Sequence, residues 1–366
     1  MPTVTSQLPV VVLVQSVVPD YRRPIVEGLR RSLGARLVVV TGEYGFEPTV
    51  RFSRVDVETT VVRNVYRARR RLLWQHGSVR LAVGADVSII EMNPRVLSTW
   101  VTLVVRRVLG RPTLAWGHAW PRAGPTARTE PVRGLMRRLA SEIVVYTNTE
   151  AAALRRLMPE KRIRAAPNGL YPESSAVSKA DERPGRDVIY VGRLVGSKKP
   201  MLLLEAFAEA LPRLPTDACL VLVGDGELLP DLRDRARVLG VRDRVHFTGH
   251  VSDFETLRSL YWDALVSVSP GYAGLSVIQS HWFGVPMVIA RNEPHAPEIE
   301  AAIEGQNAVF VESDSRAALS DAMVDVFQAR ALWLSRGPAI ARQCVVRYAI
   351  EASVRSFAAA IRAYVA

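Results

Sequence analysis

The chain has 366 residues, of which 48% are hydrophobic and 23% are charged, and its formal net charge is +12. This composition predicts a globular protein of about two domains and excludes an intrinsically disordered chain. The positive charge indicates an anionic partner, and nucleic acid, a lipid surface or a phosphorylated small molecule would each satisfy it.

Features of secreted and membrane-spanning proteins are missing from the sequence. The first apolar run, Val10 to Val14, has no basic residue before it and ends at Gln15, so it predicts a buried strand and no signal peptide. No apolar run reaches the roughly 18 residues that a spanning helix needs. Cys219 and Cys344 are too few for a disulfide framework. We therefore expect a cytoplasmic protein.

Apolar runs and stretches with helical spacing alternate through the first half, which is typical of parallel βα units. Pro24 opens the first expected helix, whose apolar face ends before Gly34 and contains Ile25, Leu29 and Leu33. The expected strands are Val10 to Val14, Leu37 to Val40, Val87 to Ile90, Thr113 to Trp116 and Ile143 to Tyr146.

A basic stretch, Arg63 to Arg80, interrupts this pattern. A group of arginines is followed directly by apolar residues: Arg67, Arg69, Arg70 and Arg71 precede Leu72, Leu73 and Trp74. The stretch predicts either an interfacial helix on an anionic membrane or a solvated basic helix. In the first case we expect peripheral membrane association and a lipid-linked acceptor.

The segment Tyr171 to Arg186 lacks periodicity and is rich in Pro, Ser, Gly and charge, as a linker would be. We place the domain boundary there, with domains at 1–172 and 173–344 and a C-terminal helix at about 345–366 that packs back on the first domain. The expected strands of the second domain are Val188 to Val191, Leu220 to Val223, Val245 to Thr248, Leu265 to Val268 and Pro286 to Ala290. The fold class is thus α/β with two Rossmann-like, doubly wound domains that bind ligands at the carboxyl ends of their strands.

Two glycine-containing turns of the second domain each follow a strand and open a helix. The first, Gly192 to Pro200, contains Lys198 and Lys199, two of only four lysines in the chain. The second, Ser269 to Ser276, offers backbone amides at a helix N-terminus, where phosphate oxygens bind. Each turn alone is also ordinary α/β architecture.

The order and spacing of motifs in the second domain resemble the GT-B family of retaining glycosyltransferases called family 4. The first domain matches only at Tyr21 to Pro24 and at Trp116 to His118. The remaining motifs are Asn168-Gly169 before the linker and, after it, Gly192-Arg193 with Lys198, Leu222 to Gly226, Phe247-Thr248-Gly249, Gly274-Leu275-Ser276, Phe283 to Pro286 and Pro297-Glu298-Ile299.

This resemblance implies two domains that face each other across a cleft and a set of functional residues. Arg193 and Lys198 would hold the donor diphosphate, and His118 would face the donor sugar, although a lone histidine in an apolar segment could equally be packed. Glu298 and His295 could either contact the donor or cap a helix. The implied donor-binding residues are Gly192, Gly249, Gly271, Tyr272, Gly274, Leu275, Ser276, Gln279 and Glu298.

The sequence departs from the family at two positions. Family members commonly carry glutamates where this chain has Gly271 and Gln279. Gln279 could still bind ribose hydroxyls as a neutral amide, whereas Gly271 offers only its backbone.

The sequence contains no metal motif: no Asp-x-Asp follows a strand, and His246 and His250 lack the helical spacing of a zinc site. We therefore expect no cofactor and no metal. The predicted function is retaining, metal-independent transfer of a sugar, of the hexosyltransferase type, from a nucleotide diphosphate-sugar to a small-molecule or lipid-linked acceptor, in cell-surface polysaccharide, glycolipid or natural-product glycoside synthesis. We expect no nucleic-acid partner. The alternative is a catalytically degenerate GT-B protein that acts as a binding or partner subunit.

Overall fold

The structure is a computed structural model that describes residues 8–46, 52–121, 124–176 and 183–365. The chain forms two compact units, one made of Met1–Gly169 with Ala349–Ala366 and the other of Leu170–Tyr348. The first unit is therefore discontinuous, because the chain returns to it for its last helix.

The first unit is built on a seven-stranded parallel sheet in the order β3-β2-β1-β6-β7-β8-β9. The strands are β1 (Val10–Gln15), β2 (Arg36–Thr41), β3 (Glu58–Val61), β6 (Val87–Glu91), β7 (Thr113–Trp116), β8 (Glu142–Val145) and β9 (Arg162–Ala165). The five strands expected in this half are confirmed, and the edge strands β3 and β9 are additional.

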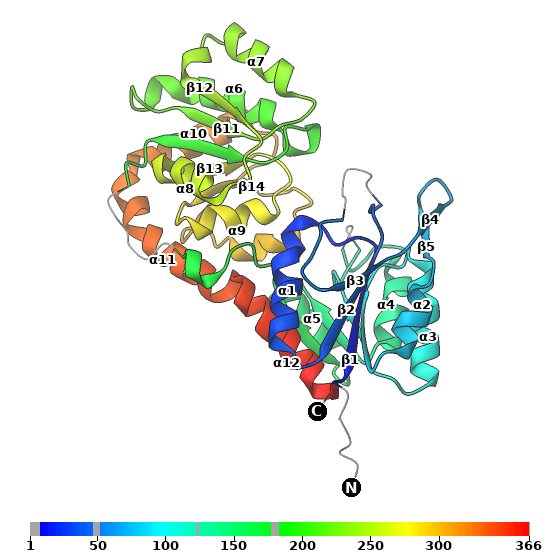
Figure 1. Cartoon of the computed structure of the whole chain (residues 1–366). Helices are drawn as coiled ribbons and strands as arrows, with labels where there is room; N and C mark the ends of the chain where they lie inside the picture. The colour runs from blue at the N-terminus through cyan, green and yellow to red at the C-terminus, as the bar shows by residue number, and fades with distance from the viewer. Residues whose placement is uncertain (1–7, 47–51, 122–123, 177–182, 366) are drawn as a thin grey trace. The chain divides into compact units, whose positions relative to one another are not determined.

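Helices cover both faces of this sheet. On one face α1 (Arg23–Ser32) lies beside α12 (Ile350–Val365), and both pack on the inner strands (Figure 1). The other face carries α2 (Ser78–Gly84), α3 (Leu97–Val108), α4 (Glu130–Leu139) and α5 (Asn148–Leu157). A 3-10 turn, η1 (Asp20–Arg22), precedes α1.

The helix expected within Arg63 to Arg80 is wrong. Residues Asn64–Arg67 (β4) and Leu72–Gln75 (β5) form an antiparallel hairpin, and helix α2 begins only at Ser78. Buried and partly exposed side chains alternate along β5, which is the two-residue period of a strand. The tip turns through left-handed residues, with φ of 50° at Ala68, 53° at Arg69 and 62° at Arg70.

The second unit contains a six-stranded parallel sheet in the order β12-β11-β10-β13-β14-β15. Its strands are β10 (Asp187–Val191), β11 (Leu220–Val223), β12 (Val245–Gly249), β13 (Ala264–Ser269), β14 (Met287–Ala290) and β15 (Ala308–Val311). All five expected strands are confirmed, with β15 added at the edge. The fold class of two Rossmann-like, doubly wound units is therefore confirmed.

Helices of the second unit again form two layers. The face under the main hydrophobic cluster carries α6 (Pro200–Ala210), α7 (Leu229–Val238) and α10 (Arg316–Gln328), and the opposite face carries α8 (Phe254–Asp263) and α9 (Leu275–Trp282) (Figure 1). Helix α11 (Arg330–Tyr348) packs on α9. The 3-10 turns are η2 (Glu173–Ser175), η3 (Gly196–Lys198), η4 (Leu211–Arg213), η5 (Arg242–Arg244) and η6 (Pro297–Ala301).

Among the helices that the structure describes, none combines the length and the hydrophobicity that crossing a membrane requires.

Phe357 is a buried aromatic side chain that anchors α12 on the first unit. Phe357 is 1% exposed and meets the ring of Trp116 edge-on, with the ring centroids 4.6 Å apart. We expect Phe357→Ala to lower the free energy of unfolding of the first unit by about 3 to 5 kcal/mol, because it leaves a cavity beneath the sheet. Calorimetric unfolding measures this.

The matched control for this substitution is Leu332→Ala at a half-exposed position of α11, which should cost less than about 0.5 kcal/mol. An equal, small effect of the two substitutions would contradict the anchoring role of Phe357.

Candidate functional site

The order of strands in the second unit creates a switch point between β10 and β13. These strands are neighbours in the sheet, yet the connections that leave them run to opposite sides. Open α/β sheets bind ligands in the crevice at such a point, beyond the carboxyl ends of the strands. The two turns there are residues 192–199 after β10 and residues 270–274 after β13.

The two turns are in direct backbone contact. The Tyr272 amide donates to the carbonyl of Ser197 at 3.1 Å, and the Lys198 ammonium donates to the carbonyl of Tyr272 at 2.7 Å. Between them, a Cβ atom on Gly271 would lie 2.7 Å from the Ser197 carbonyl oxygen. A Cβ atom at position 271 is therefore incompatible with this arrangement of the two turns.

Lys198 is a partly buried cation at the centre of this contact. Its ammonium lies 4.5 Å from the ring centroid of Tyr272. Burial, followed by the positive charge of Arg193, lowers the pKa of Lys198 to about 8. The ammonium is thus mostly protonated at neutral pH, and an anionic ligand would raise its pKa again.

Arg193 is an exposed residue in the turn after β10. Its carbonyl accepts a hydrogen bond from the Tyr190 hydroxyl at 2.8 Å, which orients the backbone at this position. The Arg193 side chain therefore projects from a fixed backbone close enough to Lys198 to affect its charge.

The Gly224-Asp225-Gly226 segment is a structural turn. A Cβ on Gly224 would lie 1.9 Å from the Gly192 carbonyl oxygen, and one on Gly226 would lie 2.4 Å from the Leu194 carbonyl oxygen. Gly224 also donates its amide to the carbonyl of Gly249 at 2.8 Å, where Gly249 itself has a φ of 74°. Glycines 192, 224 and 249 thereby bring the ends of β10, β11 and β12 together.

Helix α9 begins beside the same turns. Gly274 is its N-cap, and Leu275 and Ser276 are its first residues. The first amides of a helix have no acceptor within the helix and carry its positive dipole end, so this terminus suits an anionic group.

His295 supports the turn before α9. Its Nδ1 accepts the Ala273 amide at 3.0 Å, and its Nε2 lies 2.7 Å from the Ala290 carbonyl. The Nε2 atom therefore carries a proton, and burial lowers the pKa of His295 and favours the neutral ring. The Ala296 amide returns a hydrogen bond to the Ala273 carbonyl at 2.8 Å. His295 thus positions the backbone of the turn, a function that its sequence context does not reveal.

Gln279 and Glu298 lie near the same helix. The Gln279 amide donates to the Tyr171 hydroxyl at 2.8 Å, and the Tyr171 ring packs against Phe254 and Trp282. Glu298 is buried in η6, the 3-10 turn that begins two residues after His295.

Lys199 is not part of this cluster. It has a φ of 52°, and its ammonium makes ion pairs of 2.6 Å with Glu293 and Asp314. A left-handed conformation is one that glycine adopts without strain.

In the first unit, His118 follows β7 at the carboxyl edge of the sheet. Its ring meets the Tyr146 ring edge-on at 4.7 Å, and its carbonyl accepts from Arg133 at 2.9 Å. Although His118 reaches solvent, desolvation by the enclosing protein and then the charges of Arg133 and Arg22 lower its pKa to about 4. Its imidazole is neutral at physiological pH and offers one donor and one acceptor.

Arg22 is a further polar residue of this edge. It donates to the Gln15 side chain and to the Tyr146 hydroxyl, each at 2.6 Å, and its guanidinium lies 4.6 Å from the Trp116 ring centroid. The motif Tyr21 to Pro24 marked this position in the sequence, but the contact with Tyr146 across 124 residues is visible only in the structure.

In the part of the chain that the structure describes, no three His, Cys, Asp or Glu side chains lie together as the ligands of a metal ion would.

The fold, two Rossmann-like units of which one has cations and backbone amides at its switch point, is that of GT-B proteins. Residues 185–329 match the family model described as "Glycosyl transferases group 1", and this segment contains both turns of the candidate site. The resemblance to group 1 glycosyltransferases that the motifs indicated is thereby confirmed.

Curated relatives match over part of the chain. Mannosylfructose-phosphate synthase from Agrobacterium fabrum is 30% identical over 160 residues, 41% of this chain and 34% of that protein. Alpha-D-kanosaminyltransferase from Streptomyces kanamyceticus is 43% identical over 72 residues, 20% of this chain and 18% of that one. Alpha-monoglucosyldiacylglycerol synthase from Streptococcus pneumoniae is 33% identical over 114 residues, 30% of this chain and 25% of that one. These matches span about a third or less of each relative's length.

Solved structures match over nearly the whole chain. HepE from Anabaena, in complex with UDP, has a TM-score of 0.70 and 15% identity, covering 97% of this chain and 100% of that one. Sucrose-phosphate synthase from Thermosynechococcus elongatus has a TM-score of 0.66 and 20% identity, covering 97% and 98%. At these identities the likeness shows the fold.

The contact between the two turns predicts that a side chain at position 271 destabilises the site. We expect Gly271→Ala to destabilise the second unit by about 1 to 3 kcal/mol, because its Cβ must displace the backbone of Ser197 and Lys198. The same displacement should weaken binding of a nucleoside diphosphate. Thermal unfolding with and without nucleotide measures both effects.

Gly196→Ala in the neighbouring turn is the matched control. A Cβ there would lie more than 4 Å from every described atom outside its chain neighbours, and its φ is not left-handed. If Gly271→Ala behaved like Gly196→Ala, the close approach of the two turns would be refuted.

Proposed function

We propose that this chain is a retaining glycosyltransferase that moves a sugar from a nucleoside diphosphate-sugar to an acceptor hydroxyl without a metal ion. The observation that carries the proposal is the meeting of Lys198, the turn at 271–274 and the start of α9 at one switch point. This meeting lies within the segment that matches group 1 glycosyltransferases.

In the proposed reaction the bond between the anomeric carbon and the diphosphate oxygen breaks, and a bond to the acceptor oxygen forms. The acceptor's proton passes to the leaving diphosphate. Negative charge grows on that diphosphate in the transition state, so preorganised cations and amides beside it accelerate the step. The Lys198 ammonium uses one N–H on the Tyr272 carbonyl and has two more to offer. Arg193 and the amides at Leu275 and Ser276 would complete the set.

The remaining residues would bind the rest of the donor. His118 would face the donor sugar with a neutral imidazole, Gln279 would bind the ribose hydroxyls, and Glu298 would contact the donor. The structures of HepE contain UDP and, in one case, UDP-glucose, so UDP is the first nucleotide to test.

The acceptor is proposed only as a class. The names of two relatives refer to a sugar phosphate and to a glycolipid, which supports a hydroxyl on a small molecule or on a lipid-linked sugar. Synthesis of cell-surface polysaccharide, glycolipid or natural-product glycosides would use such acceptors. The proposed compartment is the cytoplasm, which supplies nucleotide sugars and keeps unpaired cysteines such as Cys219 and Cys344 reduced.

Arg193→Ala and Lys198→Ala should each lower kcat by about 10² to 10³, because each removes a preorganised donor from the charge that develops on the diphosphate. The measurement is release of the nucleoside diphosphate from UDP-, GDP-, dTDP- and ADP-sugars, with calorimetric binding of the free nucleotide as a second readout.

Lys199→Gly is the control for both alanine variants. It keeps the left-handed backbone and removes a cation whose partners are Glu293 and Asp314, so its turnover should stay near that of the unaltered protein. Normal turnover in both alanine variants would refute the assignment of the phosphate site. Nucleotide binding without turnover on any donor would favour the degenerate binding protein.

The lowered pKa of Lys198, about 8, makes a separate prediction about pH. The protonated ammonium binds the diphosphate, so affinity should be full below that pKa and fall as pH rises from about 8 to about 9.5. Lys198→Arg should remove this loss because a guanidinium does not titrate there, while its different geometry still impairs transfer. Calorimetry across pH measures the affinity, and an identical pH dependence in the two proteins would contradict the prediction.

A further inference from the structure

Helix α3 of the first unit presents an apolar stripe to solvent. Leu97, Val101, Val104 and Val108 follow one another at helical spacing and are all exposed, with Val104 at 48% and Val108 at 81%. Residues at this spacing lie on one face of a helix. The stripe is therefore a continuous apolar line and not a set of scattered side chains.

Neighbouring helices widen this stripe. Leu81 of α2, Leu109 after α3, and Val132 and Leu135 of α4 are also exposed, and α3 packs against both α2 and α4. Half of the large exposed hydrophobic side chains in the described part of the chain lie on these three helices or, for Leu109, directly after α3. Contiguous apolar patches of this kind mark interaction sites in proteins. We call this surface the α2–α3 face.

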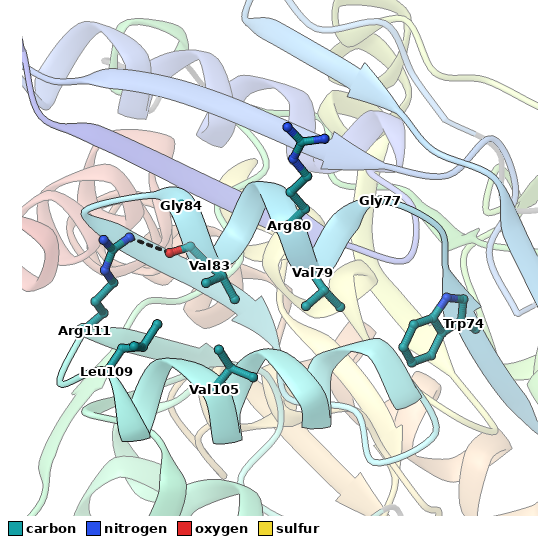
Figure 2. Close-up of a pocket in the computed structure, with 9 residues that line it drawn as sticks. All are labelled: Trp74, Gly77, Val79, Arg80, Val83, Gly84, Val105, Leu109 and Arg111. Atoms are coloured by element: carbon teal, nitrogen blue, oxygen red, sulfur yellow. Dashed lines mark hydrogen bonds between the residues drawn. The ribbon is translucent and has the colours of Figure 1, made fainter.

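An open groove of about 690 Å³ runs between α2 and α3 within this face. Figure 2 shows Val79 and Val83 pointing from α2 toward α3, Val105 pointing from α3 toward α2, and Trp74 at one end of the groove. The groove wall is almost entirely hydrocarbon, with an indole at its rim, as in surfaces that meet the boundary between lipid headgroups and acyl chains.

The buried side of α3 is fixed, so the stripe cannot turn inward. Arg106 is fully buried and donates to the carbonyls of Ala82, Ala85, Asp86 and Pro112 at 2.6 to 3.0 Å. Arg111 donates to the Val83 carbonyl at 2.6 Å across the end of the groove (Figure 2). These bonds hold α2 and α3 together with their apolar residues outward.

Helices α2 and α3, which form the groove, carry charge of one sign only. Neither α2 nor α3 contains an acidic residue, while Arg80, Arg107 and Arg111 are exposed beside the apolar stripe. Arginines next to exposed aliphatic side chains match the anionic headgroups and the hydrocarbon of a lipid surface. A twofold contact with a second copy would instead set these arginines near their own counterparts, which is unfavourable.

We propose that the α2–α3 face docks on an anionic lipid surface. The proposed membrane contact is this face and not a helix at Arg63 to Trp74, because that stretch forms a hairpin whose Leu73 is buried. Trp74 contributes to the face through the groove, where it lines one end.

Sedimentation with vesicles tests the proposal. The unaltered protein should bind vesicles of equal phosphatidylcholine and phosphatidylglycerol, and bind phosphatidylcholine alone at least tenfold more weakly. Arg80→Glu and Arg107→Glu should each weaken binding by roughly fivefold or more, since a cation near an anionic surface contributes about 1 kcal/mol. Val104→Asp with Val108→Asp should remove most of the binding.

Matched controls lie on the second unit. Val238→Asp alters an equally exposed valine, at 76%, near the end of α7, and Arg242→Glu alters an exposed arginine, so both should bind vesicles like the unaltered protein. Unchanged unfolding temperatures show that each variant is folded, and Val104→Ser with Val108→Ser is the milder substitute. No binding to the mixed vesicles, or equal binding by the face variants and the controls, would overturn the proposal. A dimer in the absence of lipid that Val104→Asp dissociates would overturn it as well.

Discussion

The candidate site depends on the backbone contact between the turns after β10 and β13. The strand order makes β10 and β13 neighbours, so the two turns leave the sheet side by side. Their approach, with the Tyr272 amide on the Ser197 carbonyl, leaves no room for a Cβ at position 271. The same contact holds the Lys198 ammonium beside the start of α9, so one constraint positions both a cation and a set of helix amides.

The consequence for chemistry is a change in how the donor sugar would be held. The family resemblance implies a carboxylate at position 271, whereas this chain has only backbone there, closely approached by the turn around Ser197. The turn at residues 270–274 is held by two hydrogen bonds, one from the Ala273 amide to His295 and one from the Ala296 amide to the Ala273 carbonyl. The candidate site therefore combines the Lys198 ammonium with the amides at the start of α9, and position 271 contributes only main-chain atoms.

Much of the fold was predictable because central strands of parallel sheets are buried on both faces and read as apolar runs. The strands that the sequence analysis missed in the two sheets, β3, β9 and β15, all lie at sheet edges. Strands β3 and β9 are short and largely polar, as an edge with one open side allows, whereas β15 is a four-residue apolar run. The helix predicted within Arg63 to Arg80 was wrong for a different reason. Its arginines and leucines suggested a helical face, but the left-handed turn at Ala68 to Arg70 reverses the chain.

The site residues divide in the same way. Glycines before helices, a lysine in the first turn and the helix start at Gly274 are local patterns, so they are visible in the sequence. The bond from Lys198 to the Tyr272 carbonyl, the Tyr171 partner of Gln279 and the support from His295 join distant segments. No local pattern contains such contacts, because they depend on how the turns pack.

Thermal unfolding with nucleoside diphosphates in the presence of EDTA tests the central claim most directly. If cations and amides at the β10 and β13 switch point bind the diphosphate without metal, one of UDP, GDP, dTDP or ADP at 100 times its Kd should stabilise the protein by about 2.7 kcal/mol. The stabilisation should be the same with and without EDTA and should shrink in Lys198→Ala. Stabilisation that EDTA abolishes, or that Lys198→Ala retains in full, would contradict the account.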